Sequence, residues 1–230
     1  MGKLYTIAEH FYSFQGEGLH LGRAAYFMRL YGCDVQCTWC DSGFTWRKEL
    51  RPTDMIKLSG LEIAGLVREL HKEVFVVLTG GEPCLYDLTE IIDALHEQGR
   101  EVHIETAGHR NIPLDIDFIT VSPKTAFGVM PLKDNLKRAH QVKLICTSAE
   151  DINKQLEEVS QYISETCTVW LHPEHGDRTS KELLDAIVNT IKHHQGRLDI
   201  RAGWQVHKLY RADALDQNTR NENGTHRLRA

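Results

Sequence analysis

Residues 24–42 read AAYFMRLYGCDVQCTWCDS, and this stretch decides how the rest of the chain is interpreted. An apolar, strand-like run leads directly into Cys33, Cys37 and Cys40, which are spaced C-x3-C-x2-C. A structural zinc site is closed by four protein ligands, usually two cysteine pairs or a Cys2His2 set, and no second pair follows here. Each iron of a four-iron cubane takes one external ligand. Three cysteines would therefore leave one iron open to a small molecule.

The composition is that of an ordinary globular protein. The 230 residues suffice for one domain with a sizeable core, and 41% of them are hydrophobic and 26% charged. The formal net charge of −5 argues against nonspecific nucleic-acid binding, and no apolar run approaches the roughly 20 residues of a membrane helix. Because the first residues lack the apolar core of a signal peptide, we expect a cytoplasmic protein, in which clustered thiols indicate metal or redox chemistry.

From residue 24 onward, short β-rich runs alternate with helical patterns. Leu88, Ile91, Ile92 and Leu95, for example, recur at i, i+3, i+4 and i+7, which predicts a helix with one buried face. The expected helices are residues 60–72, 88–98, 149–164 and 180–194. The expected strands are residues 24–30, 74–79, 101–106, 118–121, 141–145, 169–171 and 198–201.

These strands are mostly continuous apolar runs, which are typical of a parallel sheet covered by helices. An open α/β sheet and a partial barrel both fit the length, because about six βα units are too few for a closed barrel of eight. We predict the α/β fold class, as a partial, incomplete TIM-like βα barrel of about six parallel strands. The barrel domain is expected over residues 1–210, and residues 211–230 are expected to form a polar, disordered tail.

Unusual polar residues recur where the predicted strands end. Besides the cysteines, they are Thr79-Gly80-Gly81-Glu82-Pro83, Glu105-Thr106, Ser122-Pro123-Lys124 and His172-Pro173-Glu174-His175. In βα barrels, the loops after the strands converge on the active site. The sequence therefore predicts that these clusters meet at one face of the sheet.

The other three cysteines are expected to serve packing. Cys146 and Cys167 lie within apolar runs, where a buried thiol behaves as a small hydrophobic group. Cys84 follows the Gly80–Pro83 turn and lies near the predicted site, but we expect it to pack as well.

The cysteine spacing, with Trp39 before the last cysteine, resembles the signature of the radical SAM superfamily, as does GGEP at 80–83. The resemblance implies a [4Fe-4S] cluster on Cys33, Cys37 and Cys40, whose open iron binds S-adenosylmethionine and whose reduction yields a 5′-deoxyadenosyl radical. Gly81 and Glu82 would lie near the methionine amino group, where glycines allow close approach of the backbone. The resemblance further implies that the cofactor is lined by Glu105, Ser122, Pro123, Lys124, His172, Pro173, Glu174 and His175, although relatives often begin this last segment with Gln.

Within the superfamily, the chain resembles the 7-carboxy-7-deazaguanine synthases up to about Tyr210. The residues that carry the resemblance are FQGEG at 14–18, Arg29, the cysteines with Asp41-Ser42, TGGEPC at 79–84, Glu105-Thr106, Ser122–Lys124 and QVHK at 205–208. This family converts 6-carboxy-5,6,7,8-tetrahydropterin into 7-carboxy-7-deazaguanine, with loss of ammonia, for queuosine and other 7-deazapurines. The adenosyl radical removes a hydrogen from C6 of the pterin.

The resemblance also assigns individual roles. The pterin would be contacted by Phe14, Gln15, Gly16, Glu17 and Thr79. Arg29 would grip the substrate carboxylate, for which a planar guanidinium is well suited. Ser42 takes a Mg2+ position where threonine is common, and it still offers a hard oxygen donor. The resemblance also implies a homodimer. A low-potential cluster leads us to expect a flavodoxin or ferredoxin as electron donor. From the net charge and the apolar runs, we expect no direct nucleic-acid or membrane partner.

Two other interpretations remain open at this point. Glycyl-radical activating enzymes are also short radical SAM proteins with this cysteine spacing, but they act on a partner protein, and the FQGEG and QVHK segments argue against them. A zinc-stabilised binding module would complete its site with a distant histidine. Iron and sulfide content distinguish a cluster from a single zinc ion.

Overall fold

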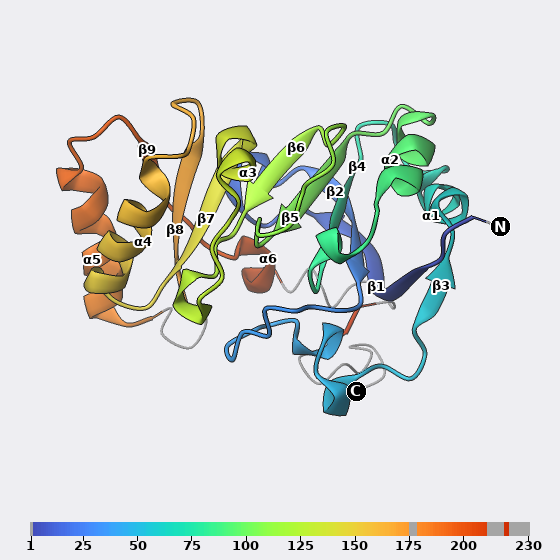
Figure 1. Cartoon of the computed structure of the whole chain (residues 1–230), viewed down its shortest axis with the longest axis horizontal. Coiled ribbons are helices and arrows are strands. Elements are labelled where there is room, and N and C mark those ends of the chain that lie inside the picture. The colour runs from blue at the N-terminus through green and yellow to red at the C-terminus, as the bar shows by residue number, and fades with distance from the viewer. Residues whose placement is uncertain (1, 175–178, 211–218, 221–230) are drawn as a thin grey trace.

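The computed structural model describes residues 2–174, 179–210 and 219–220. The strands of this part of the chain form one nine-stranded sheet in the order β3-β1-β2-β4-β5-β6-β7-β8-β9 (Figure 1). Their bounds are β1 (Tyr5–Phe14), β2 (Ala24–Leu30), β3 (Ile56–Leu58), β4 (Phe75–Gly80), β5 (Val102–Thr106), β6 (Phe118–Val121), β7 (Gln141–Cys146), β8 (Thr168–Pro173) and β9 (Asp199–Ala202).

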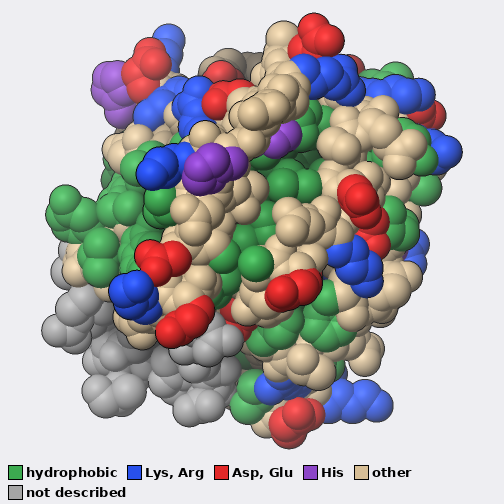
Figure 2. Space-filling model, turned by 90° about the vertical axis from the view of Figure 1, so that its left-hand side faces the viewer, with side chains coloured by type: hydrophobic (Ala, Val, Ile, Leu, Met, Phe, Trp, Pro, Cys, Tyr) green, Lys and Arg blue, Asp and Glu red, His purple; other side chains and the backbone are tan. Residues whose placement is uncertain are grey.

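Helices follow most of the strands. Their bounds are α1 (Gly60–Val67), α2 (Thr89–His96), α3 (Lys133–Arg138), α4 (Ala149–Ser160), α5 (Lys181–His193) and α6 (Val206–Leu209). In Figure 1, α1 and α2 lie at one end of the molecule, and α4 and α5 lie at the other end beside β8 and β9. Figure 2 views the latter end, where acidic and basic side chains are interspersed. Among the described residues, none of the helices has the length and apolar character needed to cross a bilayer.

The predicted partial βα barrel is confirmed. Each of the seven expected strands is present within two residues of its expected bounds, and together they pair in parallel from β2 through β4 to β9. The parallel part therefore has seven strands where about six were expected. The four expected helices also form, although α1 ends at Val67 and α4 at Ser160, both earlier than predicted.

The sequence pattern does not predict β1, β3, α3 or α6. β1 runs antiparallel to β2 over almost its whole length, and β3 adds antiparallel to the far side of β1. The segment after β1 folds back through hydrogen bonds between Gln15 N and Arg23 O and between Gly22 N and Gln15 O, each 2.8 Å long. This turn carries the FQGEG segment.

The early end of α1 has a specific cause in Arg100, a buried arginine before β5. Its guanidinium donates hydrogen bonds to the carbonyl oxygens of Val67 and Leu70, both at 2.6 Å, and to those of His71 and Val74. Carbonyls at a helix end need partners outside the helix, and here one side chain supplies them. The chain can therefore turn after Val67 and enter β4.

Strand alternation sorts the side chains onto two faces of the sheet. Tyr26, Met28 and Leu30 of β2 belong to the large core under the helices, whereas Ala25 and Phe27 belong to a small cluster with Phe75 and Val77 of β4, and with Phe11. Side chains on one face of a strand recur at every second residue. The next positions on the inner face are therefore Arg29 in β2 and Thr79 in β4.

Aromatic rings fill the inner face at the start of the parallel strands. The imidazole of His103 stacks on Phe75 at 4.1 Å between ring centroids and lies 4.6 Å from the ring of His20. Phe118 closes the group at 5.0 Å from His103. Burial lowers the pKa of His103 to about 2, so the ring is neutral in the folded protein.

This neutral histidine predicts a pH-dependent stability. The unfolded chain binds a proton at His103 with an ordinary pKa near 6.5 and the folded chain does not, so stability falls as pH drops below that value. Between pH 7 and pH 5, the free energy of unfolding is expected to fall by about 2 kcal/mol less in His103→Phe than in the wild type. Urea unfolding of the cluster-free proteins at both pH values measures this. The exposed His193→Gln serves as control, and an equal pH dependence of wild type and His103→Phe would refute the prediction.

Candidate active site

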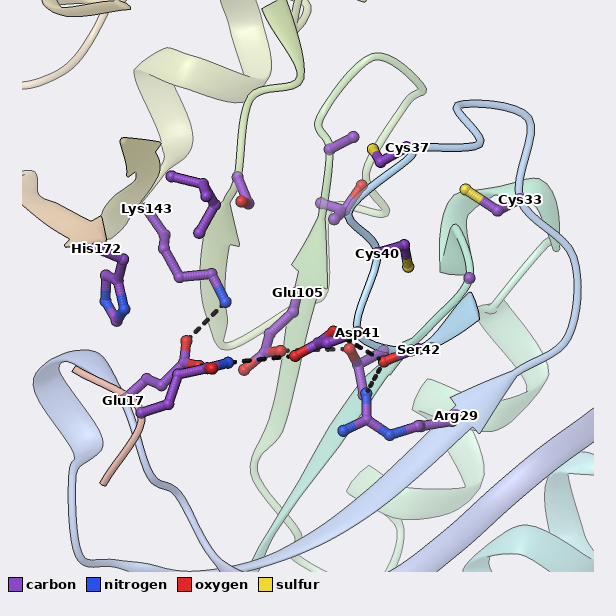
Figure 3. A pocket seen from close by; sticks show the side chains of 18 of the residues that line it. Glu17, Arg29, Cys33, Cys37, Cys40, Asp41, Ser42, Glu105, Lys143 and His172 are labelled. Atoms are coloured by element: carbon purple, nitrogen blue, oxygen red, sulfur yellow. Dashed lines mark hydrogen bonds and ion pairs between the residues drawn. The ribbon is translucent and has the colours of Figure 1, made fainter. Parts of the chain in front are cut away.

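A cavity of about 210 Å³ opens over the inner face of the sheet. Figure 3 shows the three cysteines on one side of this pocket, His172, Lys143 and Glu17 on the other, and Glu105 between them. The residues that line it and were predicted as site residues are Phe14, Gln15, Glu17, Arg29, Cys33, Cys37, Cys40, Ser42, Thr79, Gly81, Glu82, Glu105, Ser122, Lys124, His172, Pro173 and Glu174. Gly16 and Pro123 are buried beside the pocket but do not line it. His175 lies outside the described residues.

The cysteine loop follows β2 directly, and all three thiols are unbonded and line the pocket. Burial raises the pKa of Cys37 to about 11 and also raises the pKa values of Cys33 and Cys40. Binding of iron must therefore displace their protons. The described residues contain no group of three or more His, Cys, Asp or Glu that could hold a single metal ion. A cubane takes each cysteine at a different iron, so its ligands need not converge on one point.

Two glycines of the GGEP motif let β4 lie against the cysteine loop. Gly80 has a φ of +113°, and a Cβ there would come within 2.4 Å of the Leu30 nitrogen. A Cβ at Gly81 would lie 2.0 Å from the carbonyl oxygen of Gly32 and 3.3 Å from Cys33 Cβ. Only glycine fits such contacts without a shift of the backbone. These glycines therefore place the first cysteine, a role in addition to the predicted approach to the cofactor.

Glu82 is almost fully buried, and its carboxylate accepts hydrogen bonds from other residues of the chain. Oε1 accepts hydrogen bonds from Thr106 Oγ1 at 2.6 Å and from Cys84 N at 3.0 Å, and Oε2 accepts from Ala107 N at 2.9 Å. The predicted contact of Glu82 with the cofactor stays a prediction. In the structure, the Glu82 carboxylate links the turn after β4 to the end of β5 through these hydrogen bonds.

Glu105 joins two of the predicted substrate residues. Its Oε1 accepts a hydrogen bond from Gln15 Nε2 at 3.0 Å, and its Oε2 accepts from Thr79 Oγ1 at 3.3 Å. Gln15 comes from the turn after β1 and Thr79 from β4, so one carboxylate fixes side chains that are far apart in the sequence. Glu105 was predicted to line the cofactor, but in the pocket it contacts the residues assigned to the pterin.

Sequence reasoning missed Lys143, the central cation of the pocket. Its Nζ lies 2.6 Å from Glu17 Oε2, and both side chains are largely buried. Burial by itself would raise the pKa of Glu17, but Lys143 and His172 outweigh it and lower that pKa to about 2. Burial would lower the pKa of Lys143, but Glu17 and Glu105 raise it above its ordinary value. The pair is therefore ionised, with the carboxylate facing the pocket.

The segment Gln205–Lys208 closes over this pair. Gln205 Nε2 donates to Glu17 Oε1 at 2.9 Å and lies 3.3 Å from Asp41 Oδ2, and Lys208 Nζ lies 3.4 Å from the same Asp41 oxygen. The backbone N of Val206 donates to the carbonyl of Gly16 at 3.0 Å. The QVHK motif was noted in the sequence without a role. It links the FQGEG turn to the end of the cysteine loop.

Arg29 and Ser42 meet at the opposite wall. Arg29 Nη1 lies 3.4 Å from Ser42 Oγ, and Ser42 Oγ lies 3.2 Å from Asp41 Oδ1. The Nε of Arg29 pairs with Glu9 Oε2 at 2.8 Å. The predicted magnesium residue thus has a second hard oxygen beside it, on Asp41, to which the sequence interpretation gave no role.

The ends of β6 and β8 complete the pocket. Lys124 Nζ donates to the carbonyl oxygen and to the hydroxyl of Ser122, at 2.6 and 2.7 Å, and desolvation lowers its pKa to about 8. His172 is 2% exposed, burial lowers its pKa to about 4, and its Nε2 has no hydrogen-bond partner among the described residues. The same ring edge packs against Gly203, where a Cβ would come within 2.1 Å of Nε2, so the contact of His172 with the cofactor stays a prediction.

The expectations for the remaining cysteines are confirmed. Cys146 and Cys167 are buried in the core under the helices, and Cys84 is partly buried and packs against it. Burial raises the pKa values of all three thiols to about 12. They are inert packing groups in this structure.

Comparison with known proteins agrees with this pocket. The Radical SAM superfamily profile matches residues 29–187. A 7-carboxy-7-deazaguanine synthase of Synechocystis sp. is 35% identical over 206 residues, which cover 89% of this chain and 91% of the relative. The enzyme of that name from Escherichia coli K12 is 35% identical over 157 residues, covering 60% of this chain and 70% of the relative.

A solved structure resembles the whole barrel. The crystal structure of QueE from Escherichia coli aligns with a TM-score of 0.72 at 28% identity, covering 86% of this chain and 93% of that one. The profile spans the cysteine loop and most of the parallel strands, and the sequence matches extend over the pocket. The chain therefore belongs to the 7-carboxy-7-deazaguanine synthase family of the radical SAM superfamily.

Proposed function

We propose that this chain converts 6-carboxy-5,6,7,8-tetrahydropterin into 7-carboxy-7-deazaguanine with loss of ammonia, in the biosynthesis of queuosine and related 7-deazapurines. The main support is that one pocket holds a guanidinium at Arg29, an ionised carboxylate at Glu17 and a three-cysteine loop beside them. A carboxypterin carries a carboxylate at one end and a guanidine-like edge at the other. The two charged residues complement these two ends.

The cofactors of this radical SAM enzyme are a [4Fe-4S] cluster and S-adenosylmethionine. When bound, they supply a carbon-centred radical that can remove a hydrogen atom from the substrate. Cys33, Cys37 and Cys40 would hold the cluster. We also propose that S-adenosylmethionine is faced by Gly81, Glu82, Ser122–Lys124 and His172–Glu174, nearly all of which line the pocket. The corresponding role of His175 remains a sequence prediction.

The chain's own residues are proposed to bind and orient the pterin. Arg29 offers Nη1 to the substrate carboxylate while Nε stays on Glu9. Glu17, held ionised by Lys143, accepts from the guanidine-like edge, and Gln15 offers both a donor and an acceptor. Phe14 and Thr79 line the same wall, and Gly16 contributes backbone beside it. Glu105 is proposed to position Gln15 and Thr79.

The role of Lys143 gives a prediction with a pH signature. In Lys143→Met, Glu17 loses its strongest ionic partner, so its pKa rises and the carboxylate protonates as pH falls. The KM for the pterin is expected to rise about tenfold at pH 7 and further toward pH 5.5, while the wild-type KM stays flat. Steady-state kinetics across this range test it, with the exposed Lys192→Met as control. A pH-independent change in KM would show that Lys143 does not act through Glu17.

Mg2+ is proposed to bind at Ser42. The Ser42 hydroxyl and the Asp41 carboxylate present two hard oxygens 3.2 Å apart at the pocket wall. Mg2+ usually takes one or two protein oxygens and completes its shell with water and substrate. The proximity of Arg29 opposes a cation, so substrate oxygens that engage Arg29 would have to accompany the ion.

Further proposals concern assembly, partners and location. The resemblance supports a homodimer, and a low-potential cluster supports a flavodoxin or a ferredoxin as electron donor. The sequence composition supports a protein that acts in the cytoplasm and binds neither nucleic acid nor membrane directly. Size-exclusion chromatography with light scattering tests the dimer.

Product analysis tests the proposed reaction. The anaerobically reconstituted protein would be given reductant, S-adenosylmethionine, Mg2+ and 6-carboxy-5,6,7,8-tetrahydropterin, and the mixture analysed by mass spectrometry. We expect 7-carboxy-7-deazaguanine, formed more slowly when Mg2+ is omitted. Accumulation of 5′-deoxyadenosine without this product would leave the radical chemistry intact and reject the substrate.

A further inference from the structure

Two residues of the polar C-terminal tail are buried in the structure. Of residues 211–230, the structure describes Thr219 and Arg220, whose exposed fractions are 1% and 7%. A composition rich in polar residues predicts disorder for this segment, so the burial of an arginine within it requires a specific set of partners.

Arg220 lies where β1 leaves its ladder with β3. That ladder runs from Tyr5 to Ile7, and an irregularity in the β1–β2 register between Ile7 and Glu9 places a bulge at Ala8. The Nε of Arg220 donates to the Ala8 carbonyl oxygen at 2.8 Å, and its Nη2 pairs with Asp54 Oδ1 at 2.7 Å. The guanidinium therefore fastens the tail to the bulge.

The backbone of the same residue holds Glu9. The Arg220 N–H donates to Glu9 Oε1, while Glu9 Oε2 pairs with Arg29 Nε at 2.8 Å. The Glu9 side chain is 4% exposed. A buried carboxylate is stable only when its oxygens are paired, and bulges commonly re-aim side chains near active sites. Arg220, Glu9 and Arg29 thus form a continuous chain of contacts from the tail to the pocket.

We propose that Arg220 is a positioning residue for Arg29, and that the C-terminal tail thereby tunes recognition of the substrate carboxylate. This rests on the proposed function, which assigns Arg29 to that carboxylate. With Glu9 Oε1 bound by Arg220, Glu9 Oε2 is held where it pairs with Arg29 Nε, and Arg29 lines the pocket before substrate arrives. Pre-organisation of this kind strengthens binding without a new contact to the ligand.

The full-length Arg220→Ala variant tests the proposal. We expect its KM for 6-carboxy-5,6,7,8-tetrahydropterin to rise about tenfold, with kcat within about twofold of wild type. Binding of 6-methyl-5,6,7,8-tetrahydropterin, in which a methyl group replaces the carboxylate, is expected to stay unchanged. In an Arg29→Met background, Arg220→Ala is expected to have no further effect, because coupled residues are non-additive.

Arg201→Ala is the matched control, since this half-exposed arginine pairs with Asp199 at the far edge of the sheet. If Arg220→Ala does not fold, Asp54→Ala releases the same guanidinium from a half-exposed partner, with a smaller shift in the same direction expected. Equal weakening of both pterins, additivity with Arg29→Met, or kinetics like those of Arg201→Ala would overturn the proposal. A wild type that forms no product would instead reject the proposed function.

Discussion

Cys37→Ala is expected to abolish cluster assembly and product formation together. Cys37 is the middle cysteine of the loop and lines the pocket, and the residue is only 6% exposed, so no solvent-derived ligand can readily replace it. A cubane held by two cysteines would lose a further iron ligand. A full cluster contains about four iron atoms per chain, and we expect the iron content of the variant to lie far below that value. The rate of product formation is expected to fall at least about 1,000-fold.

Iron, sulfide and product are measured on the same reconstituted sample. The matched control is Cys167→Ala, because Cys167 is also buried but lies in the core and does not line the pocket. This control should retain its iron and most of its activity. A Cys37→Ala protein with full iron content and wild-type turnover would show that the cluster is held elsewhere.

Arg29→Met is expected to weaken binding of the substrate while the cluster still assembles. The variant loses the charge assigned to the carboxylate, which is expected to raise the KM for the carboxypterin about 100-fold, or about 3 kcal/mol. Iron content should be unchanged. Reductive cleavage of S-adenosylmethionine without pterin should also persist, because the three cysteines assigned to the cluster are unchanged. Substrate kinetics and 5′-deoxyadenosine analysis separate the two effects.

Arg29→Met also carries a stability cost that must be controlled. It leaves the Glu9 carboxylate buried without its ionic partner, which is expected to destabilise the fold by about 3 kcal/mol. Glu9→Gln combined with Arg29→Met removes the stranded charge and should recover part of that loss in urea unfolding. The double variant should keep the raised KM. If it bound the carboxypterin as tightly as the wild type, Arg29 would not be the carboxylate residue.

Most of the parallel strands were predictable because they are nearly continuous apolar runs, which favour burial on both faces. β1 was not, because the adjacent Glu9 and His10 interrupt its apolar residues and because it pairs antiparallel with β2. A strand of that kind is defined by its neighbour as much as by its own sequence. The FQGEG motif was therefore identified from the sequence, but the strand that precedes it and positions it in the pocket was not predicted.

The same limit explains the site residues that were missed. Lys143 lies in an apolar run, and its position on the inner face, two residues from Gln141 and Ile145, becomes visible once the strand register is known. Sequence motifs also do not reveal which carboxylates accept hydrogen bonds from other residues of the chain. Glu82 and Glu105 match the family pattern, yet their oxygens are bound by Thr106 and Ala107 in one case and by Gln15 and Thr79 in the other.

The most direct test of the central claim is hydrogen transfer from substrate. The reconstituted enzyme would be supplied with 6-carboxy-5,6,7,8-tetrahydropterin carrying deuterium at C6, and the 5′-deoxyadenosyl group would be examined by mass spectrometry. The account predicts deuterium in 5′-deoxyadenosine or in recovered S-adenosylmethionine, in parallel with formation of 7-carboxy-7-deazaguanine. Product formed with no deuterium in the adenosyl group would contradict it.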